Sequence, residues 1–117
     1  MILICGIPNA GKTTYSAQIK NVVHYDDLPL TTRQRYERII ELAQHGEVCI
    51  DGVYGERWRR VELLRACKGQ KNVCIWVDTP VEVCMSRGRE TLVKMYAKHF
   101  EPPTLDEGWD EIIIKRG

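Results

Sequence analysis

The 117 residues are 44% hydrophobic and 28% charged, which is the composition of an ordinary globular protein and a length that suits one domain spanning residues 1–117. The formal net charge of +1 excludes a strong overall field that would recruit nucleic acid, so any basic surface has to be local. No apolar run approaches the roughly 20 residues of a membrane span, and the apolar start lacks the basic leader of a signal peptide. Five scattered cysteines without a C-x-x-C pair favour a reducing compartment, so we expect a cytoplasmic protein without a membrane partner.

Apolar and helical segments alternate along the whole chain. Strands are predicted at residues 1–5, 22–25, 47–51, 73–77 and 111–115. Helices are predicted at residues 12–20, from the Thr31 cap to about Gly46, and at 56–67, 81–86 and 91–100. Because the strands are short, apolar on both faces and separated by helices, they predict a parallel sheet that is covered on both sides.

Two of these helices allow more detailed predictions. Thr31 and Gln34 have the spacing of a capping box at the start of the second helix. The buried stripe of that helix is expected at Tyr36, Ile39, Ile40 and Ala43. In the third helix we expect Trp58, Val61 and Leu64 to face the core, with Leu63 as a further candidate.

A glycine-rich segment joins the first strand to the first helix. Residues 5–14 read Cys-Gly-Ile-Pro-Asn-Ala-Gly-Lys-Thr-Thr and contain the phosphate-binding spacing G-x-x-x-x-G-K-[ST] in its usual strand-to-helix context. The glycines allow successive backbone N–H groups to converge on phosphate oxygens. Lys12 can then reach the β- and γ-phosphates, and the Thr13 hydroxyl can ligate Mg²⁺. The residues expected to bind the nucleotide are Gly6, Ile7, Pro8, Asn9, Ala10, Gly11, Lys12, Thr13 and Thr14. We therefore expect ATP and Mg²⁺ as cofactors, and a three-layer α/β/α sandwich of the P-loop NTPase type with a five-stranded parallel sheet.

Carboxylates follow two other strands, and in open α/β sheets ligands bind beyond the carboxyl ends of the strands. Asp26 or Asp27 after the second strand would face the γ-phosphate and could accept the proton of an attacking hydroxyl. The alternative is that this pair is only a solvated turn. Asp51 ends the third strand and could hold Mg²⁺ directly or through water, or could instead be satisfied by loop amides.

Arginines supply the candidate cations. Arg87 and Arg89 flank Gly88 where a helix breaks after the fourth strand, the position of the lid in P-loop kinases, whose arginines neutralise the transferring phosphoryl group. Six more lie near the starts of the second and third helices and could line an acceptor site or contact a polynucleotide backbone. They are Arg33, Arg35, Arg38, Arg57, Arg59 and Arg60. The alternative is that they form solvated helix faces. His24, His45 and His99 have no partner pattern, and no role is assigned to them.

The chain resembles the P-loop kinase module of the polynucleotide kinase/phosphatase family. The resemblance rests on the phosphate loop Gly6–Thr14, the Asp26-Asp27 pair, and the segment Met95–Trp109, which reads MYAKHFEPPTLDEGW. A similar segment occurs in related kinases that act on the seryl group of a charged tRNA. No Asp-x-Asp motif is present, so the resemblance covers the kinase half of the family only, and the lid is short.

The resemblance implies further roles. Asp26 would be the general base for a 5′-hydroxyl, Arg87 would lie near the adenine, and Arg89 near the transferring phosphate. The family often has an arginine soon after its paired aspartates to hold the acceptor phosphate; Leu28 and Pro29 stand there in this chain. Arg33 or Arg35 would take over that task, with Asp27 beside them in the acceptor site. Residues 100–109 would return the chain beside the nucleotide base.

These observations predict an ATP-dependent kinase that phosphorylates a hydroxyl, with the 5′-hydroxyl of DNA or RNA as the first choice of acceptor. Lys12, Arg89 and Mg²⁺ would stabilise the transferred charge, with Asp26 as the base and Asp51 as an aid to the metal. Two alternatives remain open. One is a kinase of a small metabolite, a nucleoside or an aminoacyl-tRNA, and the other is a nucleotide-binding module without catalysis. The sequence does not predict the oligomeric state.

Overall fold

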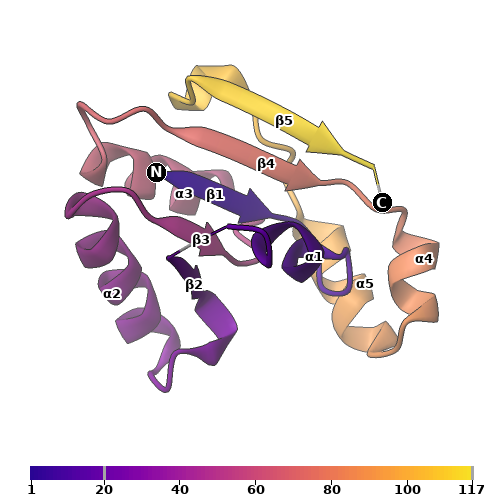
Figure 1. The fold of residues 1–117 in the computed structure, drawn as a ribbon. Coiled ribbons are helices and arrows are strands. Elements are labelled where there is room, and N and C mark those ends of the chain that lie inside the picture. The colour runs from indigo at the N-terminus through magenta and orange to yellow at the C-terminus, as the bar shows by residue number, and fades with distance from the viewer. Residues whose placement is uncertain (20, 117) are drawn as a thin grey trace.

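Five parallel strands form the centre of the molecule (Figure 1). The computed structural model describes residues 1–19 and 21–116. The strands are β1 (Ile2–Cys5), β2 (Val22–His24), β3 (Cys49–Asp51), β4 (Val73–Val77) and β5 (Glu111–Lys115). They pair in the order β2-β3-β1-β4-β5, and every pair is parallel. The predicted five-stranded parallel sheet is confirmed, and its order places β1, with its phosphate loop, at the centre.

Helices cover both faces of this sheet and complete three layers. They are α1 (Lys12–Ser16), α2 (Thr32–Gln44), α3 (Arg57–Ala66), α4 (Val81–Ser86) and α5 (Glu90–His99). Successive residues of β1 point to opposite faces, so Leu3 packs with the residues of α2 and α3, whereas Ile4 packs with those of α4 and α5. No described helix is long and apolar enough to cross a membrane.

The ends of the helices agree with the local sequence signals. Thr31 accepts a hydrogen bond from the Gln34 backbone N–H and the Gln34 side chain accepts one from the Thr31 N–H, so the predicted capping box is present. Ile39 and Ala43 form the buried part of the α2 stripe. The first helix is shorter than predicted: α1 ends at Ser16, and Lys20, the last residue of the predicted helix, lies outside the described residues.

The inward face of α3 differs from the prediction. Trp58 is 50% exposed, whereas Arg60 is completely buried beside Leu63 and Leu64. The indole of Trp58 instead stacks on the Arg59 guanidinium, 3.8 Å from it, and donates a hydrogen bond to Glu56. The pattern of apolar residues could not predict this, because the burial of Arg60 depends on an ion pair with Glu107, a residue far away in the sequence.

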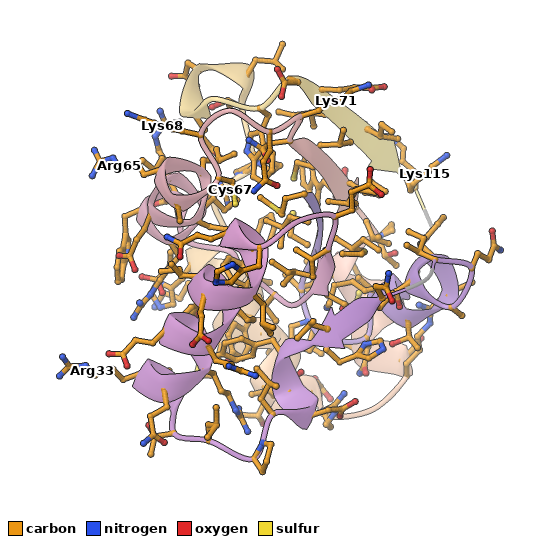
Figure 2. The ribbon with its side chains drawn as sticks, turned by 60° about the vertical axis from the view of Figure 1, so that its left-hand side comes forward. Arg33, Arg65, Cys67, Lys68, Lys71 and Lys115 are labelled. Carbon is orange, nitrogen blue, oxygen red and sulfur yellow. The ribbon has the colours of Figure 1, made fainter. Side chains whose placement is uncertain are left out.

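The cysteines all lie in the interior and are free thiols. Cys5 and Cys74, on the neighbouring strands β1 and β4, have their sulfur atoms 3.6 Å apart. Cys67, labelled in Figure 2, follows α3 and directs its thiol toward the Ala43 carbonyl of α2. These residues therefore act as small apolar side chains in the core.

Candidate active site

A cavity of about 550 Å³ lies at the carboxyl edge of the sheet. Its walls come from the phosphate loop, from the ends of β2 and β3, and from the segment that joins α4 to α5. The parallel order β2-β3-β1 brings these three strand ends together, because all parallel strands present their carboxyl ends at one edge. Residues from positions 8 to 96 thus meet in one site.

The phosphate loop occupies the centre of this edge. Asn9 and Gly11 have positive φ angles of 66° and 100°, a conformation that glycine adopts freely and asparagine tolerates. The Lys12 ammonium group donates hydrogen bonds to the carbonyl oxygens of Gly6 (2.9 Å) and Ile7 (3.0 Å). Burial lowers the pKa of Lys12, while the nearby charges of Asp51 and Asp26 act in the opposite direction. The lysine therefore lies against its own loop, at the position that an incoming phosphate would share.

Asp51 lies beneath the loop at the end of β3. It is only 6% exposed and accepts a hydrogen bond of 3.0 Å from the Ser16 hydroxyl of α1. Nδ1 of His24 lies 3.3 Å from the same carboxylate oxygen. The parallel register of β2 and β3 pairs His24 with Asp51, a contact that no sequence pattern had indicated.

The donor groups near this carboxylate suit Mg²⁺. Thr13 and Asp51 both line the cavity. Among residues 1–19 and 21–116, no group of three or more His, Cys, Asp and Glu side chains is arranged to hold a metal ion. Mg²⁺ normally binds through one or two protein ligands and takes its other ligands from water and substrate phosphates. One hydroxyl and one carboxylate beside a phosphate loop fit that preference.

The paired aspartates follow β2 in a 3-10 turn at Tyr25–Asp27. Both side chains are exposed and both line the 550 Å³ cavity. Asp26 also lines a second cavity of about 260 Å³ between α2 and α3, which Asp27 does not. Asp26 is therefore the carboxylate at the junction of the two cavities.

The two arginines of the short lid meet the phosphate loop at Asn9. Arg87 donates to the Asn9 backbone carbonyl (2.8 Å), and Arg89 donates to its side-chain oxygen (3.1 Å). The Asn9 side-chain amide in turn donates to the carbonyls of Gly88 (2.8 Å) and Cys84 (3.2 Å). Asn9 thus connects the loop to the segment that carries both guanidinium groups, and Arg87 and Arg89 line the cavity as their predicted role requires.

Replacing Asn9 should separate the effect of this connection from the effect of backbone strain. Asn9→Gly removes the side-chain hydrogen bonds and keeps the left-handed backbone accessible, so we expect a loss of about 1 kcal/mol in the free energy of unfolding. Asn9→Ala adds the cost of a left-handed alanine, about 1 kcal/mol more. Urea unfolding measures both. Equal stability of the two variants would contradict the strained backbone, and wild-type stability of Asn9→Gly would contradict the connection.

None of the six arginines near α2 and α3 lines the 550 Å³ cavity, and two of them match the alternative of a solvated helix face. Arg33 and Arg38 form exposed ion pairs with Glu37 and Glu41 on α2 itself, and Figure 2 shows Arg33 pointing away from the molecule. Helical pairs of this kind form between side chains three or four positions apart. The proposed acceptor role of Arg33 is therefore not supported by its position.

Arg57 and Arg60 of α3 bind the segment before β5. Arg57 contacts Asp106 and Glu107, and Arg60 forms a buried, bidentate pair with Glu107 in which both distances are 2.8 Å. Residues 104–107 consequently pack against α3, and none of residues 100–109 lines the 550 Å³ cavity.

Arg35 and Arg59 are the two arginines of this group that line the 260 Å³ cavity. Three tyrosine rings pack together in its wall, with centroids 5.0–6.2 Å apart: Tyr25, Tyr36 and Tyr54. Tyr25 and Tyr54 pack edge-to-face on each other at 6.2 Å. The cavity is therefore small, aromatic and flanked by cations.

Comparisons with known proteins identify the fold. No family model matches the chain, and no curated protein matches it. Among solved structures, a gluconokinase from Sinorhizobium meliloti 1021 superposes with a TM-score of 0.81 at 17% sequence identity, covering 98% of this chain and 81% of that one. A sugar kinase from Janibacter sp. HTCC2649 gives a TM-score of 0.71 at 18% identity, covering 98% of this chain and 83% of that one. The protein APE1195 gives 0.60 at 18% identity, with 96% and 82% covered. At these identities the likeness shows the fold alone, and that fold is the one of P-loop kinases.

Proposed function

We propose that this protein is an ATP-dependent kinase that transfers the γ-phosphoryl group to a hydroxyl of a small metabolite. One observation carries the proposal: the 550 Å³ cavity joins the phosphate loop, a buried strand-end carboxylate, the exposed Asp26-Asp27 pair and two arginines. Phosphoryl transfer depends mainly on positioning and on neutralising charge, and each of these groups matches one of its needs. The names of two similar structures, a gluconokinase and a sugar kinase, support a small acceptor.

Within this proposal the residues have separate tasks. Gly6–Thr14 binds the ATP phosphates, with Lys12 moving from its loop carbonyls to the β- and γ-phosphates. Thr13 and Asp51 would hold Mg²⁺. Mg²⁺ bound there would neutralise phosphate charge. Asp26 accepts the proton of the acceptor hydroxyl, and Arg87 and Arg89 contact the nucleotide and the transferring phosphate.

A polynucleotide acceptor is less well supported than a small one. A polynucleotide needs a track of free cations along its backbone. Four of the six arginines once considered for that track are paired with carboxylates: Arg33, Arg38, Arg57 and Arg60. The cavity beside Asp26 holds about 260 Å³ and so suits a small molecule.

A screen with γ-³²P-labelled ATP and Mg²⁺ tests the proposal. The acceptors are sugars, sugar acids, sugar alcohols, nucleosides and a 5′-hydroxyl oligonucleotide. We expect label in at least one small acceptor and none in the oligonucleotide. Label in the oligonucleotide alone would overturn the small-acceptor assignment. ATP binding without turnover on any acceptor would favour a non-catalytic nucleotide-binding module.

A further inference from the structure

The 260 Å³ cavity directly adjoins the proposed phosphoryl-transfer site. Asp26, Val53 and Tyr96 line both this cavity and the 550 Å³ cavity that contains the phosphate loop. A molecule in the smaller cavity can therefore present a hydroxyl to Asp26 while the rest of it contacts the walls between α2 and α3. The chemistry of these walls bears directly on which acceptors fit.

Arg59 is the distinctive group in these walls. Its guanidinium carbon lies 3.7 Å from the centroid of the Tyr36 ring and 3.8 Å from that of Trp58, so two aromatic faces hold it in a sandwich. Its Nε is buried and has no hydrogen-bond partner among the residues that the structure describes. Within residues 1–19 and 21–116 no carboxylate lies within 4.0 Å of it, although Arg57 and Arg60 on the same helix are both paired.

An unpaired buried donor is costly, and a charged one more so. The acidic neighbour that could satisfy Arg59 is Glu56, but its carboxylate accepts a hydrogen bond of 2.9 Å from the Trp58 indole at the exposed rim. The aromatic sandwich fixes the plane of the guanidinium and leaves only its edges for hydrogen bonds. A planar guanidinium edge is the geometry that binds carboxylate or phosphate oxygens in pairs.

The rest of the cavity supports an anion beside Arg59. Arg35 enters from α2, where its Nε donates to the Leu28 carbonyl at 2.9 Å. It brings a second positive charge to the cavity. Burial raises the pKa of both Tyr36 and Tyr54, so these hydroxyls stay neutral at physiological pH and carry no charge that would repel an anion.

Two of the tyrosines in these walls pack closely against the loop after β3. A methyl group added at Gly52 would lie 3.1 Å from the Tyr25 Cβ and 3.1 Å from the Tyr54 ring. The tyrosines therefore sit against the strand-exit loop with no room to spare. The acidic side chains that line this cavity lie at its edges: Asp26 at the junction with the larger cavity and Glu56 at the exposed rim. The charge in the interior therefore comes from the arginines.

We propose that this cavity binds the anionic group of a hydroxylated acceptor, a carboxylate or a phosphate, with Arg59 as its main contact and Arg35 as the second. The inference rests on the proposed kinase function and adds a requirement for an acceptor with a negative charge. Arg59 would make the chain discriminate between an anionic polyol and its neutral counterpart.

Three probes test this requirement with the phosphate loop first saturated by MgADP, so that a phosphate probe cannot occupy it. They are D-gluconate, sorbitol 6-phosphate and neutral sorbitol, titrated by calorimetry. We expect at least one of the two anions to bind more tightly than sorbitol. The anion that binds more tightly shows whether the cavity prefers a carboxylate or a phosphate. In Arg59→Gln we expect that anion to bind on the order of 10- to 100-fold more weakly, the range of one lost charged hydrogen bond. Sorbitol affinity should stay the same.

Arg33→Gln is the matched control, because Arg33 is 90% exposed and lies outside the cavity; its affinities should equal those of the wild type. Arg59→Lys keeps the positive charge and replaces Arg59→Gln in the experiment if that variant does not fold. It should weaken the binding of the anion by a smaller factor than Arg59→Gln. Equal affinity for sorbitol and both anions, or an equal loss for all three probes in Arg59→Gln, would overturn the inference while leaving the kinase function intact. Failure of MgADP to bind would instead overturn the proposed function, and the inference with it.

Discussion

Replacing Asp26 by Asn should lower kcat about 100- to 10,000-fold, the usual contribution of a general base, while ATP binding is retained. Asn keeps the size of the side chain and removes its ability to accept a proton. Asp26 lies where the 550 Å³ and 260 Å³ cavities meet, which is why the proposed function gives it the role of base. Steady-state phosphorylation of the best acceptor measures kcat, and calorimetry with MgATP measures the binding.

Asp27→Asn is the control for this experiment, since Asp27 follows Asp26 in the same 3-10 turn and is equally exposed. It lines only the larger cavity, so we expect its kcat to fall by less than 10-fold. The opposite ranking of the two variants would transfer the role of base to Asp27. A loss of MgATP binding in Asp26→Asn would mean that Asp26 acts on the nucleotide and not on the acceptor.

Replacing Glu107 by Gln should lower the free energy of unfolding by about 3–5 kcal/mol, because it leaves the buried charge of Arg60 without a counterion. Both side chains are 0% exposed and their two oxygen–nitrogen contacts are 2.8 Å each. Arg60 also donates to the Tyr54 carbonyl, and Glu107 accepts from the Trp109 indole. The pair thereby attaches the loop after β3, which contains Tyr54, to the segment before β5. Urea unfolding of wild type and variant at pH 7 gives the difference.

This stabilisation should depend on pH. Burial by itself would raise the pKa of Glu107, but the hydrogen bonds from Arg60 and Trp109 and the charge of Arg60 hold it below its usual value. A lowered pKa means that the contribution is complete above the unfolded-state pKa of about 4.3 and is lost as the pH falls through the lower folded-state value. The stability difference between wild type and Glu107→Gln should therefore shrink as the pH is lowered below about 4.

Two further variants test the assignment to the buried pair. Asp106→Asn changes an exposed carboxylate that contacts Arg57 and should leave the urea midpoint nearly unchanged. The double variant Arg60→Met with Glu107→Leu removes both charges. It should be more stable than Arg60→Met alone or Glu107→Leu alone, because no buried charge remains unpaired. Equal losses in Asp106→Asn and Glu107→Gln, or additive losses in the double variant, would contradict the role of the pair.

The fold was largely predictable from the sequence, because its signals are local. Four-to-five-residue apolar runs gave the five strands, the Thr31–Gln34 capping box gave the start of α2, and the phosphate-loop spacing gave the fold class. Errors were confined to element ends, such as the short α1, and to the inward face of α3. There an arginine is buried because Glu107, 47 positions along the chain, pairs with it.

The site was predictable where its residues follow one another or end a strand. Gly6–Thr14 is a continuous motif, Asp26 follows β2 in the next turn and Asp51 ends β3, and the carboxyl ends of these strands share one edge. The sequence did not indicate His24, because its contact with Asp51 depends on β2 being the neighbour of β3. Strand order cannot be predicted from a local sequence pattern. The connection of Asn9 to Arg87 and Arg89 likewise spans about 80 positions.

By itself the sequence determined the α/β architecture, the phosphate loop and the carboxylates at the strand ends, because each depends on residues within a few positions of one another. The tertiary structure alone decided what the similar arginines near α2 and α3 do. Arg33 and Arg38 pair on the surface, Arg57 and Arg60 hold residues 104–107, and Arg59 lies between two aromatic rings. A guanidinium has the same chemistry at every position, so its task is set by which carboxylates and rings the fold brings within a few ångströms.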